Sequence, residues 1–312
     1  MTKSINQPAT AQTRGAPLRE VRTLLYYYPS KFARLAQISL SSFNPFNPFN
    51  FGCGFTALGA LAAGGLLFLL PANGHAATNR FSFNDYLVAP VRVHLLSAKD
   101  SPAIQTTLTD KDIARILGKL DGVWFQAGVH FYLESLLREE AAHLETFAQS
   151  GTLPPSGLLE LRPDASKAAG MFHIYYVKEM PNNGIYFPEA IFVKDTAALR
   201  KVEGGIDEPL PRVTSHELGH ALSLPHRQDT TNLMASGTTG TWLNEAEIKQ
   251  AREAARKLDW IAPAPGLMKQ ADALFRANNR AEAARLYSRL ATIPLKADQV
   301  ELARKRMAQS VF

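Results

Sequence analysis

Residues 216 to 226 read His-Glu-Leu-Gly-His-Ala-Leu-Ser-Leu-Pro-His, and Met234 follows eight residues after the last histidine. If residues 211–224 form one helix, His216 and His220 lie one turn apart on the same face, about 6 Å along the axis. Two imidazoles at that separation can bind one metal ion at about 2.0–2.1 Å from each nitrogen. The spacing therefore predicts a metal site on this helix, around which the rest of the fold is organised.

Two neighbouring residues complete the pattern. Glu217 follows the first histidine by one position, about 100° round the helix, which leaves its carboxylate free of the metal but near a metal-bound water. Pro225 ends the helix, so His226 can turn back as a third ligand. Three neutral nitrogen ligands leave a fourth position open, which is typical of a catalytic rather than a structural zinc.

The third histidine and the downstream methionine make this stretch similar to the metzincin superfamily of zinc endopeptidases, and the spacing to Met234 resembles its matrixin branch. The resemblance implies that His216, His220 and His226 bind one zinc ion. It also implies that Glu217 is the general base and that Met234 forms an apolar floor beneath the ligands. The alternative for the first five residues is a solvated helix face that carries two histidines and an acid by chance.

Two residues depart from the pattern of the family. Ser223 stands where the family usually has glycine, the residue that turns the chain toward the third ligand. A non-glycine residue with positive φ costs on the order of 1 kcal/mol, which a rigid site can absorb. Ser236 stands where some metzincins have a tyrosine two residues after the methionine. A site built from zinc, water and Glu217 is therefore the expected arrangement.

The resemblance and the residue patterns together predict an α+β, zincin-like fold, with a twisted mixed sheet, long helices and a C-terminal helical extension. Strands are expected over residues 91–98, 128–134, 171–177 and 185–193, and helices over 109–127 and 136–149. Residues 181–184 read as a hairpin turn between the last two strands. By analogy with the family, Ile185 to Val193 is the candidate edge strand for extended substrate, although an ordinary paired strand fits equally well.

Residues 243–248 predict a strong helix start after the methionine. Glu245 or Glu247 could supply the third ligand in a differently built zincin, although His226 makes this unnecessary. After this helix, residues 261–266 contain two prolines and a glycine and read as a linker. We therefore expect a catalytic domain over residues 78–262 and a helical tail over 263–312.

The tail contains two short amphipathic helices on either side of Asn278 and Asn279, and a third helix can follow to Met307. The pair resembles a single tetratricopeptide-type hairpin. One such repeat cannot bury its own face, because roughly three are needed for independent stability. The tail should therefore pack on the catalytic domain or on a partner protein, and its apolar stripe is more often core than docking site.

Residues 1–77 read as a basic leader. They carry a net charge of +5 out of +6 for the whole chain, so the remainder is nearly neutral and predicts no binding of nucleic acid. An apolar run from Phe55 to Leu70 is short for a membrane span and is followed by Gly74-His75-Ala76, a pattern typical of signal-peptidase sites. We expect a secreted or cell-envelope protein, and the alternative is an uncleaved N-terminal membrane tether.

Other metal chemistry receives less support. The only cysteine, Cys53, lies in the leader, so disulfides would contribute nothing to the processed chain. His94, His130 and His173 fall inside expected strands, and their spacing matches no metal motif. Ordinary packing is the simpler interpretation, so calcium or a second zinc is not supported.

Two functions remain. The first is an exported zinc endopeptidase that hydrolyses peptide bonds with a zinc-activated water and Glu217 as the general base. The second is an envelope-associated binding protein in which a zincin shell presents the helical tail to partners. The presence of Glu217 favours the first, because a purely structural metal site needs no base.

Overall fold

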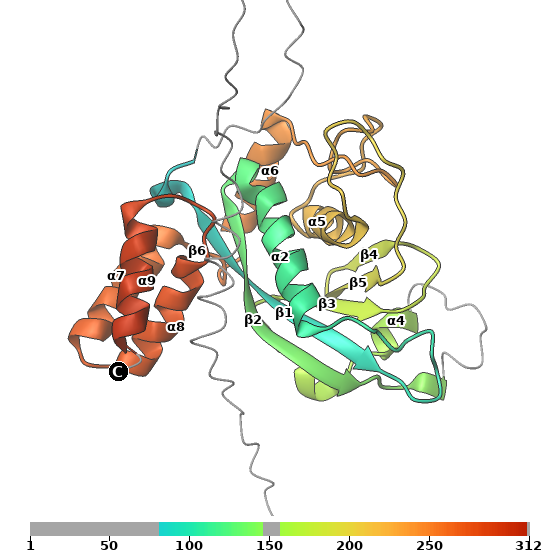
Figure 1. The fold of residues 1–312 in the computed structure, drawn as a ribbon, viewed down its shortest axis with the longest axis horizontal. Coiled ribbons are helices and arrows are strands. Elements are labelled where there is room, and N and C mark those ends of the chain that lie inside the picture. Colours follow the sequence, from blue (N-terminus) through green and yellow to red (C-terminus); the bar gives the residue numbers. More distant parts are fainter. Residues whose placement is uncertain (1–80, 146–156, 311–312) are drawn as a thin grey trace, which may run out of the picture. The chain divides into compact units, whose positions relative to one another are not determined.

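The computed structural model describes residues 81–145 and 157–310 (Figure 1). They form a twisted mixed sheet covered by helices and continued by a C-terminal group of helices, which confirms the expected fold class. The strands are β1 Leu87–Ser97, β2 Val129–Glu140, β3 Phe172–Val177, β4 Gly184–Phe187, β5 Ala190–Lys194 and β6 Ala262–Pro263. The helices are η1 Phe83–Asp85, α2 Asp110–Trp124, η2 Phe125–Ala127, α4 Gly157–Glu160, η3 Asp164–Ser166, α5 Pro209–Ala221, α6 Glu245–Arg256, α7 Ala264–Arg276, α8 Arg280–Ala291 and α9 Asp298–Ser310.

The sheet has the order β2-β1-β3-β5-β4, and β6 pairs with the start of β1. Neighbouring strands from β2 to β5 run parallel, whereas β4 is antiparallel to β5 at the end of the order. Strand β1 is longer than the expected 91–98, and all but two of its residues are buried. This burial follows from its central position, because a parallel strand covered on both faces is apolar nearly throughout.

Helices α2, α5 and α6 pack against one face of the sheet through the largest apolar core. Helix α2 begins with a capping box, in which Thr109 and Asp112 each accept a hydrogen bond from the other's backbone N–H. Ile113, Ile116 and Leu120 then place its apolar side against the sheet. On the opposite face, short helix α4 covers a smaller core that includes Tyr175 and Phe192.

The helix expected over 136–149 is wrong where the structure describes it. Strand β2 continues to Glu140, and its residues from Leu136 onward pair with the second half of β1, from Val93 to Ser97. The charged side chains that favoured a helix lie at the half-exposed end of β2. Pairing along the long central strand therefore outweighs local helix propensity here. Residues 146–149 lie outside the described part.

The single strand expected from Ile185 to Val193 is also wrong, because this segment forms the hairpin β4–β5. Pro188 and Glu189 lie between the two strands. The turn at residues 181–184 does not join β3 to β4 as a hairpin, since β3 pairs in parallel with β5. Pro188 lacks the N–H that a continuous paired strand needs, which explains why the segment breaks between β4 and β5.

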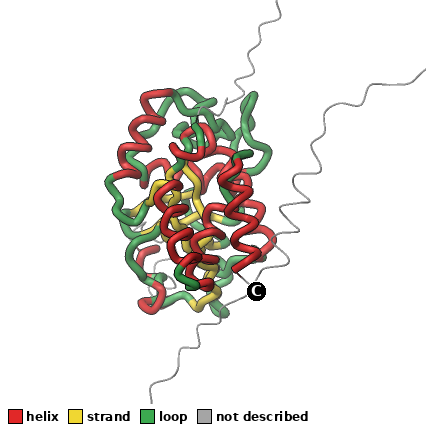
Figure 2. The backbone as a smooth tube through the Cα atoms, turned by 90° about the vertical axis from the view of Figure 1, so that its left-hand side faces the viewer, coloured by secondary structure: helices red, strands yellow, loops and turns green. Residues whose placement is uncertain are grey.

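The tail shares a core with the start of the sheet. Helices α7, α8 and α9 pack around Leu267, Tyr287 and Val300, in one apolar cluster with Tyr86 and Tyr132. Figure 2 shows these helices side by side. The linker expected over 261–266 is wrong, because it consists of β6, paired with β1, and the first turn of α7.

Two boundaries stay predictions. The division between catalytic domain and tail at residue 262 is one, although the shared core shows that the tail packs on the sheet. The leader is the other, because residues 1–77 lie outside the described part of the chain. Within the described residues, no helix combines the length and apolar character that a membrane crossing requires.

Candidate metal centre

Three histidines meet at the C-terminal end of α5. Nε2 of His220 lies 3.2 Å from Nε2 of His216 and 3.1 Å from Nε2 of His226. His216 and His220 come from the helix, and His226 comes from the loop that follows it. Among the described residues, these three form the one group of at least three His, Cys, Asp or Glu side chains that could hold a metal ion.

Two of the rings are oriented by backbone carbonyls. Nδ1 of His216 donates to the carbonyl of Leu233 at 2.8 Å, and Nδ1 of His220 donates to that of Leu224 at 2.8 Å. Because a carbonyl only accepts, the proton of each neutral ring is assigned to Nδ1 and the Nε2 lone pair faces the centre. Burial lowers the pKa of both histidines, and that of His216 falls to about 3.

This donor set fits zinc. Unprotonated nitrogens about 3.2 Å apart repel each other unless a cation lies between them. Ligand nitrogens at about 2.0–2.1 Å from a tetrahedral ion lie roughly 3.3 Å apart, close to the two measured separations. Neutral imidazole nitrogen is a preferred zinc ligand. The assignment of His216, His220 and His226 as zinc ligands stays a prediction that this geometry supports.

The turn between the second and third histidines has the conformation expected from the sequence. Ser223 has a φ of 67°, in the left-handed region that favours glycine. The N–H of Leu224 then bonds back to the carbonyl of Gly219 at 2.9 Å, which closes the helix. The chain leaves α5 at this point and brings His226 to the other two histidines.

Met234 is fully buried and packs against Gly219 of helix α5. A Cβ atom at Gly219 would lie 2.5 Å from its sulfur. Any larger residue at position 219 would therefore push the methionine away from the helix. The glycine between the two helical histidines thus has a steric reason, which the sequence pattern did not reveal.

Glu217 occupies a buried position beside strand β4. Its side chain is 5% exposed, and a Cβ atom at Gly184 would lie 2.5 Å from its Oε1 atom. Burial raises the pKa of Glu217 to about 8, and the charge of Arg212 opposes this rise. The first residue of β4 must therefore be small, because its backbone packs directly against the carboxyl group.

Arg212 is a site residue that the sequence analysis missed. It lies one turn before His216 and is only 1% exposed, and its guanidinium donates to the carbonyls of Asn232, Ala235 and Gly240. It therefore fastens the loop that carries Met234 to helix α5. Nothing in the sequence signals this role, because an arginine in a helix is usually exposed.

A cleft runs along these residues. It is lined by the start of β4, by Glu217 and the three histidines, and on the far side by Leu199, Ser236 and Gly237. Strand β4 comes last in the strand order, so the edge beside the site is β4 alone rather than the whole of residues 185–193. The cleft places an extended edge and a potential metal site side by side.

The other strand histidines are used in packing. His94 Nε2 lies 2.9 Å from His173 Nδ1, and its Nδ1 lies 2.5 Å from Glu139. His130 lies between Asp121 and Thr292, at 3.0 and 2.9 Å. None of these rings belongs to a group of three possible ligands among the described residues.

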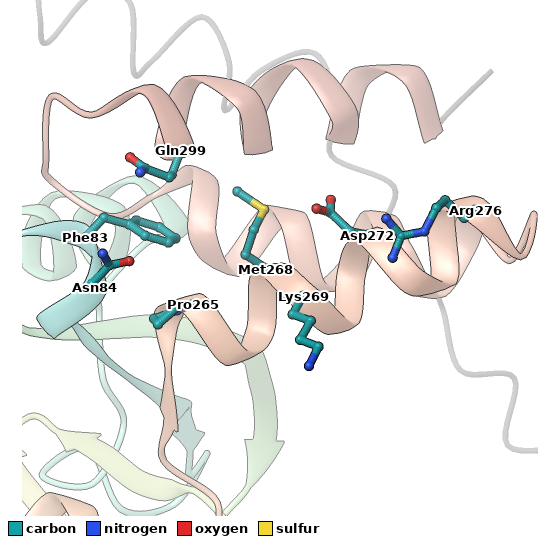
Figure 3. A pocket seen from close by; sticks show the side chains of 8 residues that line it. All are labelled: Phe83, Asn84, Pro265, Met268, Lys269, Asp272, Arg276 and Gln299. Carbon is teal, nitrogen blue, oxygen red and sulfur yellow. The ribbon is translucent and has the colours of Figure 1, made fainter.

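The tail carries a second hollow, shown in Figure 3. It runs along one side of α7, where Met268, Lys269 and Arg276 line it, and Phe83 of η1 and Gln299 of α9 close it. Residues 263–312 contain nine Lys or Arg and four Asp or Glu, a net charge of +5, whereas residues 78–262 carry 19 and 23, a net of −4. The near-neutral charge after the leader is therefore the sum of a negative charge over residues 78–262 and a positive charge over residues 263–312.

Comparison with known proteins gives no assignment by sequence. No protein-family model matches the chain, and no curated protein matches it. Similar solved structures include an archaemetzincin from Methanopyrus kandleri, with 12% identity, a TM-score of 0.38 and coverage of 54% of this chain and 96% of that one.

Two further solved structures are similar over the same extent of this chain. A metalloproteinase-II from Bacteroides fragilis has 12% identity and a TM-score of 0.30, and the match covers 53% of each chain. A zinc-dependent peptidase from Methanocorpusculum labreanum has 12% identity and a TM-score of 0.26, with coverage of 53% of this chain and 99% of that one. The neighbours are metallopeptidases, but at these identities and TM-scores the chemistry of this chain rests on its own residues.

Proposed function

We propose that this protein is a zinc-dependent endopeptidase of the matrixin-like branch of the metzincins. The observation that carries the proposal is the convergence of three imidazole nitrogens beside a buried carboxyl group. His216, His220 and His226 would hold the ion. A structural metal site would have no use for Glu217, whose carboxyl group is buried in the wall of an open cleft.

The mechanism assigns proton transfer to Glu217. When bound, zinc supplies a Lewis acid that polarises the scissile carbonyl and acidifies water. Glu217 accepts a proton from the attacking water and delivers it to the leaving amine. A carboxyl group whose pKa lies near neutrality can do both, and burial gives Glu217 this property. The positive charge of Arg212 opposes the rise in the pKa of Glu217 and so favours its ionised form.

The substrate is an extended peptide that adds to the edge of the sheet. Strand β4 pairs with β5 on one side, and its residues Gly184, Ile185 and Tyr186 line the cleft. Backbone groups at a strand edge bind an extended chain without regard to its side chains. The scissile bond then lies between β4 and the histidines.

The basic leader supports a location outside the cytoplasm. We propose that residues 1–77 direct export, which gives a secreted or cell-envelope enzyme, and that an uncleaved segment from Phe55 to Leu70 would instead tether it to a membrane. Fractionation of cells that express the full chain, with sequencing of the N-terminus of the product, distinguishes these outcomes. A full-length product in the cytoplasm would refute export.

The decisive experiment replaces Glu217 with alanine. Glu217→Ala should lower kcat/KM on an unstructured protein substrate by about a hundredfold to ten-thousandfold, because the general base is lost. Zinc content should stay near one ion per chain. The matched control is Glu253→Ala, since Glu253 is an exposed acid on α6. If Glu217→Ala cleaves as fast as the wild type, the peptidase function is wrong.

The tail supports a second candidate, an envelope-associated binding protein. The hollow along α7 is lined by Phe83 and Met268, by exposed Lys269 and Arg276, and by Asp272, which pairs with Arg306, within a tail of net charge +5 (Figure 3). These features favour an acidic partner. This function would gain if the wild type binds zinc but cleaves nothing in a broad peptide library. Retention of an acidic protein only by chains with both basic residues intact would then support it.

A further inference from the structure

The third histidine differs from the other two in how it is held. His216 and His220 each donate from Nδ1 to a backbone carbonyl, whereas none of the described residues is hydrogen-bonded to Nδ1 of His226. His226 is also exposed. Ligand histidines ordinarily need a partner on the second nitrogen to fix the ring. Something other than its own ring nitrogen must therefore fix His226.

The next residue, Arg227, is fixed at both its backbone and its side chain. Its N–H donates to the carbonyl of Met234 at 2.9 Å, and its Nε donates to Oε1 of Glu247 at 2.5 Å. The Glu247 side chain is fully buried, whereas that of Arg227 is 40% exposed. An ion pair with one buried partner and a direct hydrogen bond is stronger than a pair on the surface.

The other oxygen of Glu247 reaches the methionine turn. Oε2 accepts from Nδ2 of Asn232 at 2.8 Å and from the N–H of Asn244 at 2.9 Å. Oδ1 of Asn232 in turn accepts from the N–H of Met234 at 2.7 Å. One carboxylate thus joins the arm of the third ligand, the turn below the ligands and the first turn of α6. These contacts also exclude Glu247 as an alternative metal ligand, because both its oxygens are engaged away from the histidines.

We propose that Glu247 is a positioning residue of the metal centre, which sets His226 through Arg227 and Met234 through Asn232. The proposal rests on the proposed zinc site. Glu247 touches neither the metal nor the substrate, and it acts by holding the loop between α5 and α6 in its binding geometry. The contacts of Arg227 with Met234 and Glu247 hold the backbone next to His226, whose ring has no hydrogen bond at Nδ1 from the described residues.

Zinc affinity, measured on the full chain by competition with a chelator, tests the proposal. Arg227→Ala should raise the Kd for zinc about 10- to 100-fold, the usual effect of losing an outer-shell contact. Arg227→Lys, which keeps a donor within reach of Glu247, should retain most of the affinity. Glu247→Gln keeps an acceptor for Asn232 and Asn244 but turns a donor toward Arg227, so it should match Arg227→Ala. The double variant should be no weaker than Arg227→Ala alone.

A control variant separates positioning from stability. Arg92 also forms an ion pair, with Glu134 at 3.0 Å on β1 and β2, and neither residue lines the cleft of the proposed zinc ligands. Arg92→Ala should lower the melting temperature and leave the Kd for zinc unchanged. If Arg227→Ala and Glu247→Gln behave like Arg92→Ala, with a lower melting temperature and wild-type affinity, the positioning role is overturned. Visible spectra of the cobalt-substituted protein should change in Arg227→Ala and stay unchanged in Arg92→Ala.

The proposed function fails in a different way. A wild-type chain that takes up no zinc would refute the metal site, and the positioning role with it. A wild-type chain that binds zinc but cleaves no peptide would refute the peptidase alone, because the comparison of Kd values does not depend on turnover.

Discussion

Two histidine clusters lie in this molecule, and they solve the same electrostatic problem in different ways. In the cluster at α5, the ring nitrogens that face carbonyls carry the protons, so unprotonated nitrogens face each other. In the sheet, His94 and His173 also face each other, at 2.9 Å, but their outer nitrogens meet Glu139 and the carbonyl of Ala168. Because the carbonyl of Ala168 only accepts, Nε2 of the neutral His173 ring carries its proton, and Nδ1 of His173 accepts from Nε2 of His94.

Burial lowers the pKa of both His94 and His173, while the hydrogen bond with Glu139 opposes this for His94. In this cluster each ring nitrogen has a protein hydrogen-bond partner, so the arrangement needs no ion. The cluster at α5 has three nitrogens and no carboxylate among them, so it needs a cation from outside. The sheet histidines thus have protein partners on both ring nitrogens, whereas in the cluster at α5 the Nε2 atoms face one another.

Removing the metal or one of its proposed ligands should have the largest effect, and it should affect the cluster at α5 alone. His220→Ala should raise the Kd for zinc on the order of a hundredfold or more, because one of three protein ligands is lost. Chelation of the wild type should lower its melting temperature, since zinc stabilises only the folded state. Both are measured by chelator competition and thermal melts. A variant that binds zinc as the wild type does would show that the three histidines are not the ligands.

Gly184→Ala should affect the proposed general base without affecting zinc binding. The new Cβ atom would lie 2.5 Å from Oε1 of Glu217, so the carboxyl group must move. A misplaced general base should reduce kcat/KM about 10- to 100-fold with zinc affinity unchanged. Steady-state kinetics and a zinc titration test this. Equal kinetics in variant and wild type would show that Glu217 tolerates displacement.

The second cluster should respond in stability alone. His94→Phe keeps a ring beside Tyr175 but leaves Glu139 and His173 without their partner. We expect a loss of about 2–3 kcal/mol in the free energy of unfolding, the cost of buried polar groups left unpaired. Urea denaturation measures this loss. A concurrent fall in zinc affinity would show that the two clusters are coupled.

The smallest effect is expected at the turn. Ser223→Gly should raise the free energy of unfolding by about 0.5–1 kcal/mol, because glycine adopts a positive φ without strain. The hydrogen bond from Gln250 to the carbonyl of residue 223 does not depend on its side chain. Denaturation curves compare the two chains. A destabilised variant would mean that the serine side chain stabilises the turn.

These contrasts also show what the sequence could predict. The proposed ligands, the proposed base and the methionine lie within residues 216–234, so helical spacing and one proline bring them together through local geometry. The helix expected at 211–224 is α5, Pro209–Ala221. Contacts between segments that are distant in sequence could not be predicted. Gly184 against Glu217 and Arg212 against Gly240 depend on how strands and loops pack, which no local pattern encodes.

The wrong predictions of secondary structure all concern how strands pair. Residues 136–140 carry the charged composition of a helix but pair with β1, and residues 185–193 alternate like one strand but fold back at Pro188. Strands β4 and β5 pair with each other across this turn, whereas the partner of residues 136–140 lies far away in sequence. The linker expected at 261–266 fails likewise, because β6 pairs with residues Leu87 and Val88 at the other end of the described chain.

The loop between α5 and α6 bears on how well the protein resists proteolysis. Residues 222–244 contain no helix or strand, and such segments are the usual sites of proteolytic nicking. Here isolated backbone bridges join Arg227 to Ala235, Asn232 to Trp242 and Arg200 to Thr238. A peptide must be drawn out into an extended form before it can be cut. The bridged loop cannot extend without local unfolding, so the proposed peptidase would not readily cut this loop in neighbouring molecules or in itself.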